Sequence, residues 1–268
     1  MTASARQNDA AKKPTKETEQ KNSHYLETSS ETWEKIKPMK KLIPLLILAA
    51  SVCAETPLPP ASQILAAARA QLPPRPLHMT GTLKERAPNG FVKKVSVEMD
   101  LDWNATPPQA AYRINDEKNN RFQRLEIQWL PGGPVFQCLE NNVPVSNFNP
   151  HAEIDTLGIT WSDLSFSFLW NEEARTLRTG KKLGKESFVI SVPRPGNHSL
   201  LIWVEKKTGR MLGAEEQDID GKRQKIIKVV SVKEFDGLWM VKDLDIIRPE
   251  QNRRTSLRID TLETRPSN

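Results

Sequence analysis

Between residues 199 and 262 the chain reads SLLIWV (199–204), KIIKVVSV (225–232), LWMVKDLDII (238–247) and TSLRIDTL (255–262), separated by short polar breaks. In the last segment Leu257 and Ile259 alternate with polar residues. A two-residue period of this kind is typical of a β-strand with one face in water. A weaker segment, MLGAEEQ (211–217), lies between the first two. The stretch therefore predicts a meander of about five strands.

The breaks between these segments have the composition of tight turns. They contain KTG (207–209), DIDG (218–221) and DG (236–237), in which glycine supplies the positive φ that a tight reversal needs. Consecutive strands joined by such short breaks run antiparallel, because a parallel return needs a crossover of about a dozen residues. The C-terminal part of the chain is therefore predicted to form an antiparallel sheet.

Six short patterns lie in the second half of the chain: ITWSDL (159–164), ESFVISV (186–192), LIWVEKKTG (201–209), DG (220–221), EFDGLWM (234–240) and RTSLRI (254–259). Together they resemble the LolA-like, outer-membrane lipoprotein-sorting family. The resemblance implies a mainly β (α+β) fold, a strongly curved, incompletely closed antiparallel β-barrel with a helical lid, built as a single domain over residues 55–268. It also implies an apolar cavity for acyl chains. The family's lid-binding arginine has two possible counterparts, Arg86 and Arg113, and the sequence does not choose between them.

The first 54 residues differ from the rest in composition. Residues 1–38 are polar and lack an apolar period, so they are predicted to be disordered, or to be a mis-assigned extension of a chain that starts at Met39. Residues 39–54, MKKLIPLLILAASVCA, combine two lysines, an apolar core and a small-residue cleavage pattern. That combination predicts a signal peptide, Met39–Ala54, and export to the periplasm or envelope.

The predicted signal peptide decides how the two cysteines, Cys53 and Cys138, are interpreted. Lipidation of Cys53 is disfavoured, because Val52 precedes it where a lipid-attachment motif needs a small residue, and cleavage after Ala54 would remove it. Cys138 would then be alone, without an intramolecular disulfide, and is predicted to be a small buried apolar residue rather than a nucleophile.

One amphipathic helix is predicted over residues 61–72. Ile64, Leu65, Ala68 and Leu72 form one apolar stripe, Ser62 is placed to cap the first turn, and Pro73 ends the helix. The apolar face of the sheet is the expected partner of this stripe. Further strands are predicted over residues 79–85, 91–101, 110–114, 124–129 and 186–192.

Aromatic residues gather in a segment without strand periodicity. Residues 141–155 are polar, and Thr160 with Asp163 has the spacing of a helix cap. The aromatics after this cap are interpreted as a flap over an apolar cavity, or alternatively as ordinary core residues. The lipid-binding candidates are Trp129, Trp161, Phe166, Phe168, Trp170, Leu257 and Ile259.

The sequence offers little chemistry for catalysis or for a cofactor. Its four histidines are scattered, and it lacks zinc, phosphate-loop and catalytic-serine motifs. Asp218 and Asp220 form an acidic pair, but a hairpin turn explains them better. The net charge is +6, of which the first 54 residues carry +3, so the remainder is too weakly basic to suggest a nucleic-acid partner. We therefore expect no enzyme, no metal and no cofactor.

Two functions remain open on the sequence. The first is a periplasmic carrier of lipid or lipoprotein acyl chains that makes transient contact with a membrane, as the resemblance implies. The second is an envelope sensor or scaffold of the same fold that binds a protein partner. A lipid-modifying enzyme is a third class, but the sequence supplies no catalytic set for it.

Overall fold

The computed structural model describes residues 57–235 and 238–265. Residues 55–268 form one compact unit. The predicted extension (1–38) and the predicted signal peptide (Met39–Ala54) lie outside the described residues. Their interpretation therefore stays a prediction.

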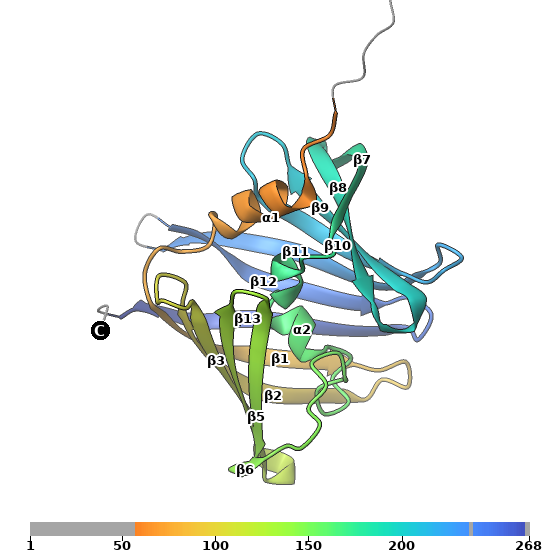
Figure 1. Ribbon diagram of the computed structural model, residues 1–268. Helices are drawn as coiled ribbons and strands as arrows, with labels where there is room; N and C mark the ends of the chain where they lie inside the picture. Colours follow the sequence, from red (N-terminus) through yellow and green to blue (C-terminus); the bar gives the residue numbers. More distant parts are fainter. Residues whose placement is uncertain (1–56, 236–237, 266–268) are drawn as a thin grey trace, which may run out of the picture. The chain divides into compact units, whose positions relative to one another are not determined.

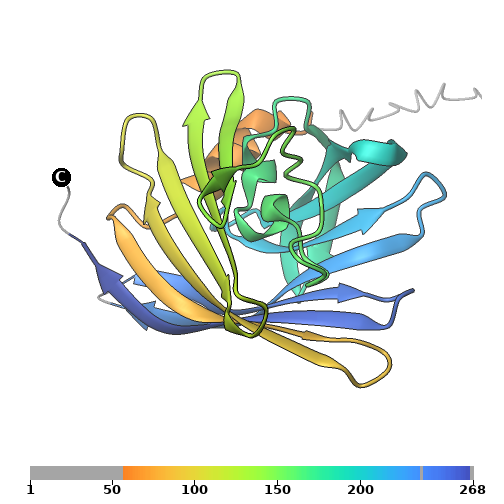
Figure 2. The same cartoon turned by 90° about the horizontal axis from the view of Figure 1, so that it is seen from below.

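The described residues form one antiparallel sheet of thirteen strands in the order β6-β5-β4-β3-β2-β1-β13-β12-β11-β10-β9-β8-β7 (Figure 1). Seen from below, the sheet bends strongly and its two ends stay apart, with the helices on its concave side (Figure 2). The strands are β1 (Leu77–Arg86), β2 (Val92–Asp102), β3 (Gln109–Asp116), β4 (Arg121–Leu130), β5 (Gly133–Glu140), β6 (Val143–Pro144), β7 (Arg175–Lys182), β8 (Lys185–Arg194), β9 (His198–Glu205), β10 (Met211–Gln217), β11 (Arg223–Phe235), β12 (Leu238–Arg248) and β13 (Arg253–Thr264). The predicted open, curved antiparallel sheet with a helical lid is confirmed.

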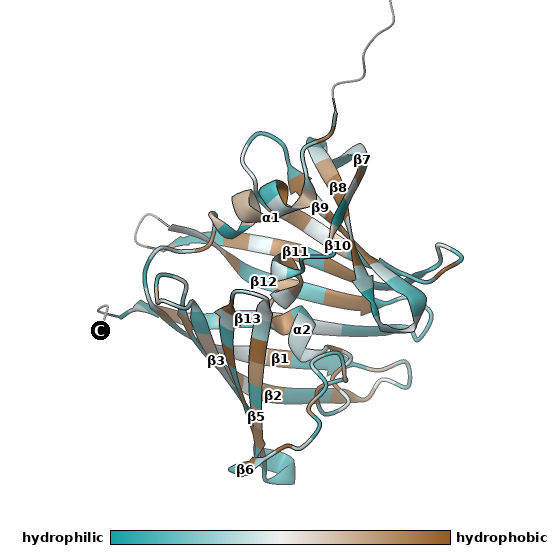
Figure 3. Ribbon diagram, viewed as in Figure 1, coloured by the Kyte–Doolittle hydropathy of each residue, from teal (hydrophilic) through white to brown (hydrophobic). Residues whose placement is uncertain are grey.

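The alternation of side chains decides which face of the sheet is buried. In β2 the inward residues Val95, Val97 and Met99 are buried, while the residues between them are exposed. Figure 3 shows the same alternation of hydrophobic and hydrophilic residues along other strands. The predicted C-terminal meander corresponds to β9 through β13, in which each strand pairs with the next. The core therefore fills the concave side of the sheet.

The helix α1 (Ala61–Arg69) lies on this concave side, but its N-cap and its last residue differ from the prediction. Ile64, Leu65 and Ala68 are buried as expected. The N-cap residue is Pro60, without a side-chain cap, so the prediction for Ser62 was wrong. The helix begins at Ala61 as predicted, but Pro60, whose ring fixes its φ, occupies the N-cap position, so Ser62 lies inside the first turn. The helix also ends at Arg69, ahead of the predicted Leu72.

The short helix α2 (Trp161–Leu164) is capped as the sequence predicts. The Thr160 hydroxyl accepts from the backbone N–H of Asp163 at 3.1 Å, and the Asp163 carboxylate accepts from the N–H of Thr160 at 3.1 Å. This reciprocal capping satisfies two backbone donors that would otherwise be buried without partners. The 3₁₀ turn η2 (Ser167–Trp170) follows at once. Two further 3₁₀ turns, η1 (Glu117–Asn119) and η3 (Pro195–Asn197), lie between strands.

Two local features follow directly from residue chemistry. The Asp218 carboxylate accepts from the backbone N–H groups of Asp220 and Lys222 at 3.1 and 2.9 Å, which confirms that this acidic pair is a turn. Gly81 marks an irregularity between β1 and β13, where a side chain at residue 81 would lie 2.3 Å from the carbonyl oxygen of Arg258. Glycine is therefore required there by close approach of two backbones.

Candidate functional site: an apolar cavity under the helices

A cavity of about 230 Å³ lies between the concave face of the sheet and the helical segments. Its floor is formed by inward residues of five strands: Met79, Met99, Leu101, Tyr112, Leu244, Leu257 and Ile259. Its roof is formed by Ala68 on α1, by Leu72 shortly after that helix, and by Leu164, Phe166 and Leu169 around α2 and η2. Aliphatic and aromatic carbon dominates the lining, so the cavity suits an apolar ligand.

The cavity is bordered by two exposed apolar residues on β11 and β12. Val232 is 52% exposed and Trp239 is 54% exposed, yet both also line the cavity. The pairing of β11 with β12 shifts register on both sides of Ser231. A bulge re-aims the side chains that follow it, so Val232 continues the inward row of Val229 although the two are three residues apart. These strands therefore bring apolar side chains to the mouth of the cavity.

Arg69 connects the two parts of the roof. Its guanidinium Nη1 donates a hydrogen bond to the backbone oxygen of Leu169 at 2.5 Å. Its Cζ lies 5.6 Å from the centroid of the Trp170 ring. This contact ties the last residue of α1 to η2. Arg86 and Arg113, the two counterparts considered from the sequence, lie elsewhere: Arg86 is exposed, and Arg113 pairs with Asp100 at 2.7 Å across β2 and β3. No periodic pattern in the sequence marks Arg69, because it lies outside the apolar stripe at the last residue of its helix.

Three tryptophans pack together beside the cavity. The ring centroids of Trp103, Trp129 and Trp170 are 4.6 to 5.5 Å apart. Stacked and tilted rings at this spacing stabilise a core beyond the area that they bury. Trp103 also lines the cavity and was missed by sequence reasoning, because it follows the last periodic residue of β2.

The seven lipid-binding candidates fall into three groups. Phe166, Leu257 and Ile259 line the cavity. Trp129 and Trp170 belong to the tryptophan cluster beside it. Trp161 and Phe168 are buried in the core under the helices. The structure thus brings three of the candidates to the cavity wall, and the other four do not line the cavity.

A buried charged cluster fixes α2 to the sheet. The Asp163 carboxylate lies 2.9 Å from Nζ of Lys225 on β11, and the same Nζ lies 2.9 Å from the carboxylate of Glu216 on β10. Burial alone would raise the pKa of Asp163, but the charges of Lys225 and Arg194 outweigh it and hold that pKa below its ordinary value. A cationic sheet surface therefore anchors the helix that carries part of the roof.

His151 joins this cluster from the loop before α2. Its Nδ1 lies 2.9 Å from Nη1 of Arg194, which also donates to the hydroxyl of Ser162 at 2.8 Å. Although His151 keeps an exposed edge, partial desolvation by its neighbours lowers the pKa of its imidazole, and the charge of Arg194 lowers it further. The imidazole is therefore favoured in its neutral form, with Nδ1 as an acceptor.

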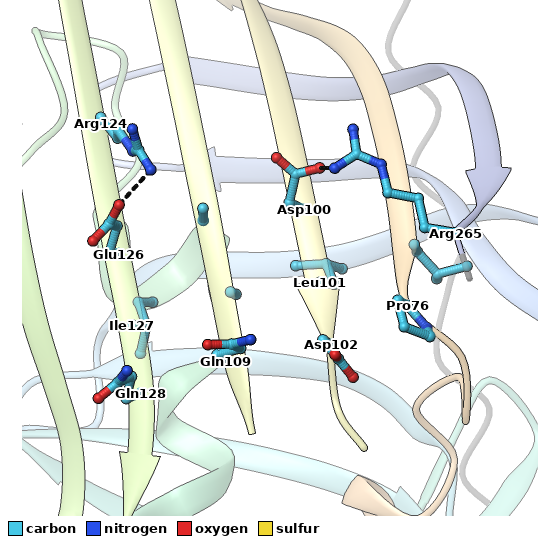
Figure 4. Close-up of a pocket in the computed structure, with 13 residues that line it drawn as sticks. Pro76, Asp100, Leu101, Asp102, Gln109, Arg124, Glu126, Ile127, Gln128 and Arg265 are labelled. Atoms are coloured by element: carbon cyan, nitrogen blue, oxygen red, sulfur yellow. Dashed lines mark ion pairs between the residues drawn. The ribbon is translucent and has the colours of Figure 1, made fainter. Parts of the chain in front are cut away.

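A second hollow, of about 550 Å³, lies on the opposite, polar face of β1 to β4 (Figure 4). Four of its five charged side chains form ion pairs with one another, and the fifth, Asp102, accepts from backbone N–H groups. The Asp100 carboxylate lies 2.7 Å from Nη1 of Arg265, and Arg124 pairs with Glu126. Because its acids and bases neutralise each other, we regard the apolar cavity as the functional site.

Two kinds of feature are absent from the part of the chain that the structure describes. Residues 57–235 and 238–265 contain no group of three or more side chains placed to hold a metal ion. Within the same ranges, no helix has the length and apolar character to cross a membrane.

Comparison with known proteins gives a likeness in structure. No protein family model and no curated sequence matches the chain. A DUF1329 family protein from Desulfovibrio piger aligns with a TM-score of 0.62 at 12% identity, covering 76% of this chain and 91% of that chain. A LolA superfamily protein from Nitrosomonas europaea aligns with a TM-score of 0.61 at 13% identity, covering 79% and 96%.

An outer membrane lipoprotein-sorting protein domain from Vibrio parahaemolyticus aligns similarly, with a TM-score of 0.59 at 13% identity over 77% of this chain and 93% of that chain. These alignments define the class of fold: the chain has a LolA-like fold. The fold resemblance inferred from the turn-and-strand patterns is confirmed. At this identity the likeness describes the architecture and leaves the cargo to be argued from the cavity.

Proposed function

We propose that the protein is a non-enzymatic carrier that holds an acyl chain of a lipid or lipoprotein in the apolar cavity. The supporting observation is the cavity itself, which combines an apolar floor on the sheet with an apolar roof on α1, α2 and η2. An acyl chain needs no directional partner, because burial of each methylene contributes about 0.8 kcal/mol. The names of the solved structures with this fold agree with such a role.

The size of the cavity limits the cargo in this conformation. Its volume of about 230 Å³ is below the roughly 300–1,000 Å³ of typical small-molecule pockets. The cavity therefore suits part of one chain rather than several chains. A larger cargo requires the roof to move, which would break the contact between Arg69 and Leu169.

The proposed site of action is the periplasm. The signal-like segment Met39–Ala54 supports export, and a carrier for acyl chains is needed where lipid crosses water. The exposed Val232 and Trp239 at the mouth suit transient contact with a membrane during loading or release.

The exposed residues at the mouth of the cavity are also consistent with a second candidate function, an envelope sensor or scaffold that binds a protein. A small cavity bordered by an exposed tryptophan could accept one apolar side chain of a partner. In that case the natural occupant would be a polypeptide and no acyl chain would be needed.

Purification of the protein from its native envelope distinguishes the carrier from the sensor or scaffold. The protein is isolated without detergent, measured by native mass spectrometry, and then extracted with organic solvent for lipid analysis. The carrier predicts a bound acyl species that the solvent removes. A stoichiometric protein with no acyl species would support the sensor and exclude the carrier.

A further inference from the structure

A third hollow, of about 390 Å³, lies on the polar face of β1 and β13. Lys84 and Arg86 on β1, with Arg254, Ser256 and Arg258 on β13, line it. Leu257 and Ile259, which alternate with these β13 residues, line the apolar cavity instead. The hollow is therefore on the opposite face of the sheet from the proposed cargo site.

The pairing of strands places like charges side by side in this hollow. Arg86 lies directly opposite Arg254, and Lys84 lies opposite Lys94 on β2. Like charges at directly opposed positions destabilise a sheet. Folding alone gives no reason for this arrangement, since neutral residues at the same exposed positions would avoid the repulsion.

The buried carboxylate of Asp245 pairs with both β13 arginines that line the hollow. Asp245 on β12 is 2% exposed, pairs with Arg254 and lies 3.4 Å from Nη2 of Arg258. It also accepts a hydrogen bond from the hydroxyl of Ser256 at 2.6 Å. The guanidinium groups are thus held on a buried anchor, which reduces the entropy lost when they bind a ligand.

The charge of this hollow is not balanced. Asp245 and Asp243 face the two arginines of β13, but Lys84 and Arg86 form no ion pair with any residue that the structure describes. The larger polar hollow on β1 to β4 differs, because both of its lining arginines, Arg124 and Arg265, pair with lining carboxylates. An excess of fixed, oriented positive charge in a concave surface attracts an anion.

We propose that this hollow is a binding site for a phosphate group. Arginine guanidinium groups match phosphate oxygens with paired N–H donors, and Lys84 adds a compact positive charge. The phosphate would lie among Lys84, Arg86, Arg254 and Arg258, and it would relieve the repulsion between Arg86 and Arg254. The same chemistry is offered by a soluble phosphate ester and by the headgroup of an anionic phospholipid.

The test compares two double variants that remove the same charge. Lys84→Gln with Arg86→Gln changes the hollow and leaves Asp245 and its arginines in place. Arg175→Gln with Arg178→Gln removes two exposed cations from β7, the edge strand at the far end of the sheet order. Inorganic phosphate is titrated into each full-length protein by calorimetry at constant ionic strength, and circular dichroism confirms that each variant is folded.

The proposal predicts saturable phosphate binding by the wild type, at least tenfold weaker binding by the Lys84/Arg86 variant, and a change below twofold in the β7 variant. Sedimentation with phosphatidylglycerol and with phosphatidylcholine vesicles then shows whether the phosphate group belongs to a lipid headgroup or to a soluble ester. Binding to the anionic vesicles that depends on Lys84 and Arg86 indicates a lipid headgroup, whereas phosphate binding without vesicle binding indicates a soluble ester. Equal losses in both variants, or no binding of phosphate or anionic vesicles by the wild type, would overturn the proposal.

Discussion

The carboxylate of Asp163 on α2 lies 2.9 Å from the ammonium group of Lys225 on β11, and the Asp163 side chain is fully buried. Lys225 also contacts Glu216 on β10, so one cation joins a roof helix to two neighbouring strands of the sheet. A buried pair of this kind fixes geometry more than it adds stability, because desolvation offsets much of the attraction. The position of the roof over the cavity therefore depends on a few charged contacts.

Replacing Asp163 by Asn should leave the buried Arg194 without an anionic partner and Lys225 with Glu216 as its remaining one. Breaking a buried pair by removing one partner costs about 3–5 kcal/mol, so the free energy of unfolding should fall by roughly that amount. Urea denaturation followed by circular dichroism measures it. Asp220→Asn, in an exposed turn, is the control and should change stability by less than about 0.5 kcal/mol. Equal stability of the two variants would contradict the anchoring role of Asp163.

His151 should make the stability depend on pH below neutrality. Partial desolvation of this half-exposed imidazole, reinforced by the charge of Arg194, lowers its folded pKa below the ordinary value. The unfolded chain then binds more protons than the folded chain, so stability is lost as pH falls below about 6.5, the ordinary pKa of histidine. Urea midpoints between pH 8 and pH 5 should decline in the wild type and decline less in His151→Gln. Parallel curves for the two proteins would show that this histidine is not linked to folding.

Gly81→Ala should destabilise the sheet beside the cavity floor. The added methyl group would lie 2.3 Å from the backbone oxygen of Arg258, so β1 or β13 must shift. Forced overpacking of this kind costs about 1–3 kcal/mol. Gly180→Ala is the matched control, since its new contact at 3.0 Å is the flexible end of the Arg178 side chain. The midpoint of thermal unfolding is measured for both variants and for the wild type. An unchanged midpoint for Gly81→Ala would argue against the close approach of β1 and β13.

Cys138 should be unreactive in the folded protein. Burial and the charge of Glu140 raise the pKa of its thiol to about 11. Only about a thousandth of the thiol would then be ionised at pH 8, and the thiolate is the reactive form. In a Cys53→Ser background, reaction with a disulfide reagent should be slow in buffer and faster by orders of magnitude in urea. Rapid reaction of the folded protein would place Cys138 on an accessible surface.

Most strands of the sheet could be predicted, because each has one face exposed to water and one buried face and its sequence alternates accordingly. The alternation in residues 91–101 and 255–262 corresponds to β2 and β13, and the glycine turns gave the antiparallel order. The strand β7 was missed because it lies at the sheet edge, where the sequence RTLRTGKK has no apolar alternation to detect. Edge strands rich in Lys and Arg are common because charge discourages pairing with other chains.

The cavity was only partly predictable for a different reason. Leu257 and Ile259 could be placed on the inner face from strand period alone, and Phe166 from the aromatic segment after the helix cap. Trp239 and Val232 reach the mouth because of two register shifts in β11, and no local sequence pattern marks those shifts. Arg69 contacts η2 across 100 residues of sequence, which is a tertiary relationship.

The central claim, that an acyl chain occupies the cavity, is tested by filling the cavity with a side chain. Val229 lines the cavity, whereas its neighbour Val230 is exposed and does not. Delipidated wild type, Val229→Trp and Val230→Trp are titrated with a fluorescent fatty acid. We expect saturable micromolar binding by the wild type and by Val230→Trp, and at least tenfold weaker binding by Val229→Trp. Absence of binding by the delipidated wild type, or equal affinity of all three proteins, would contradict the account.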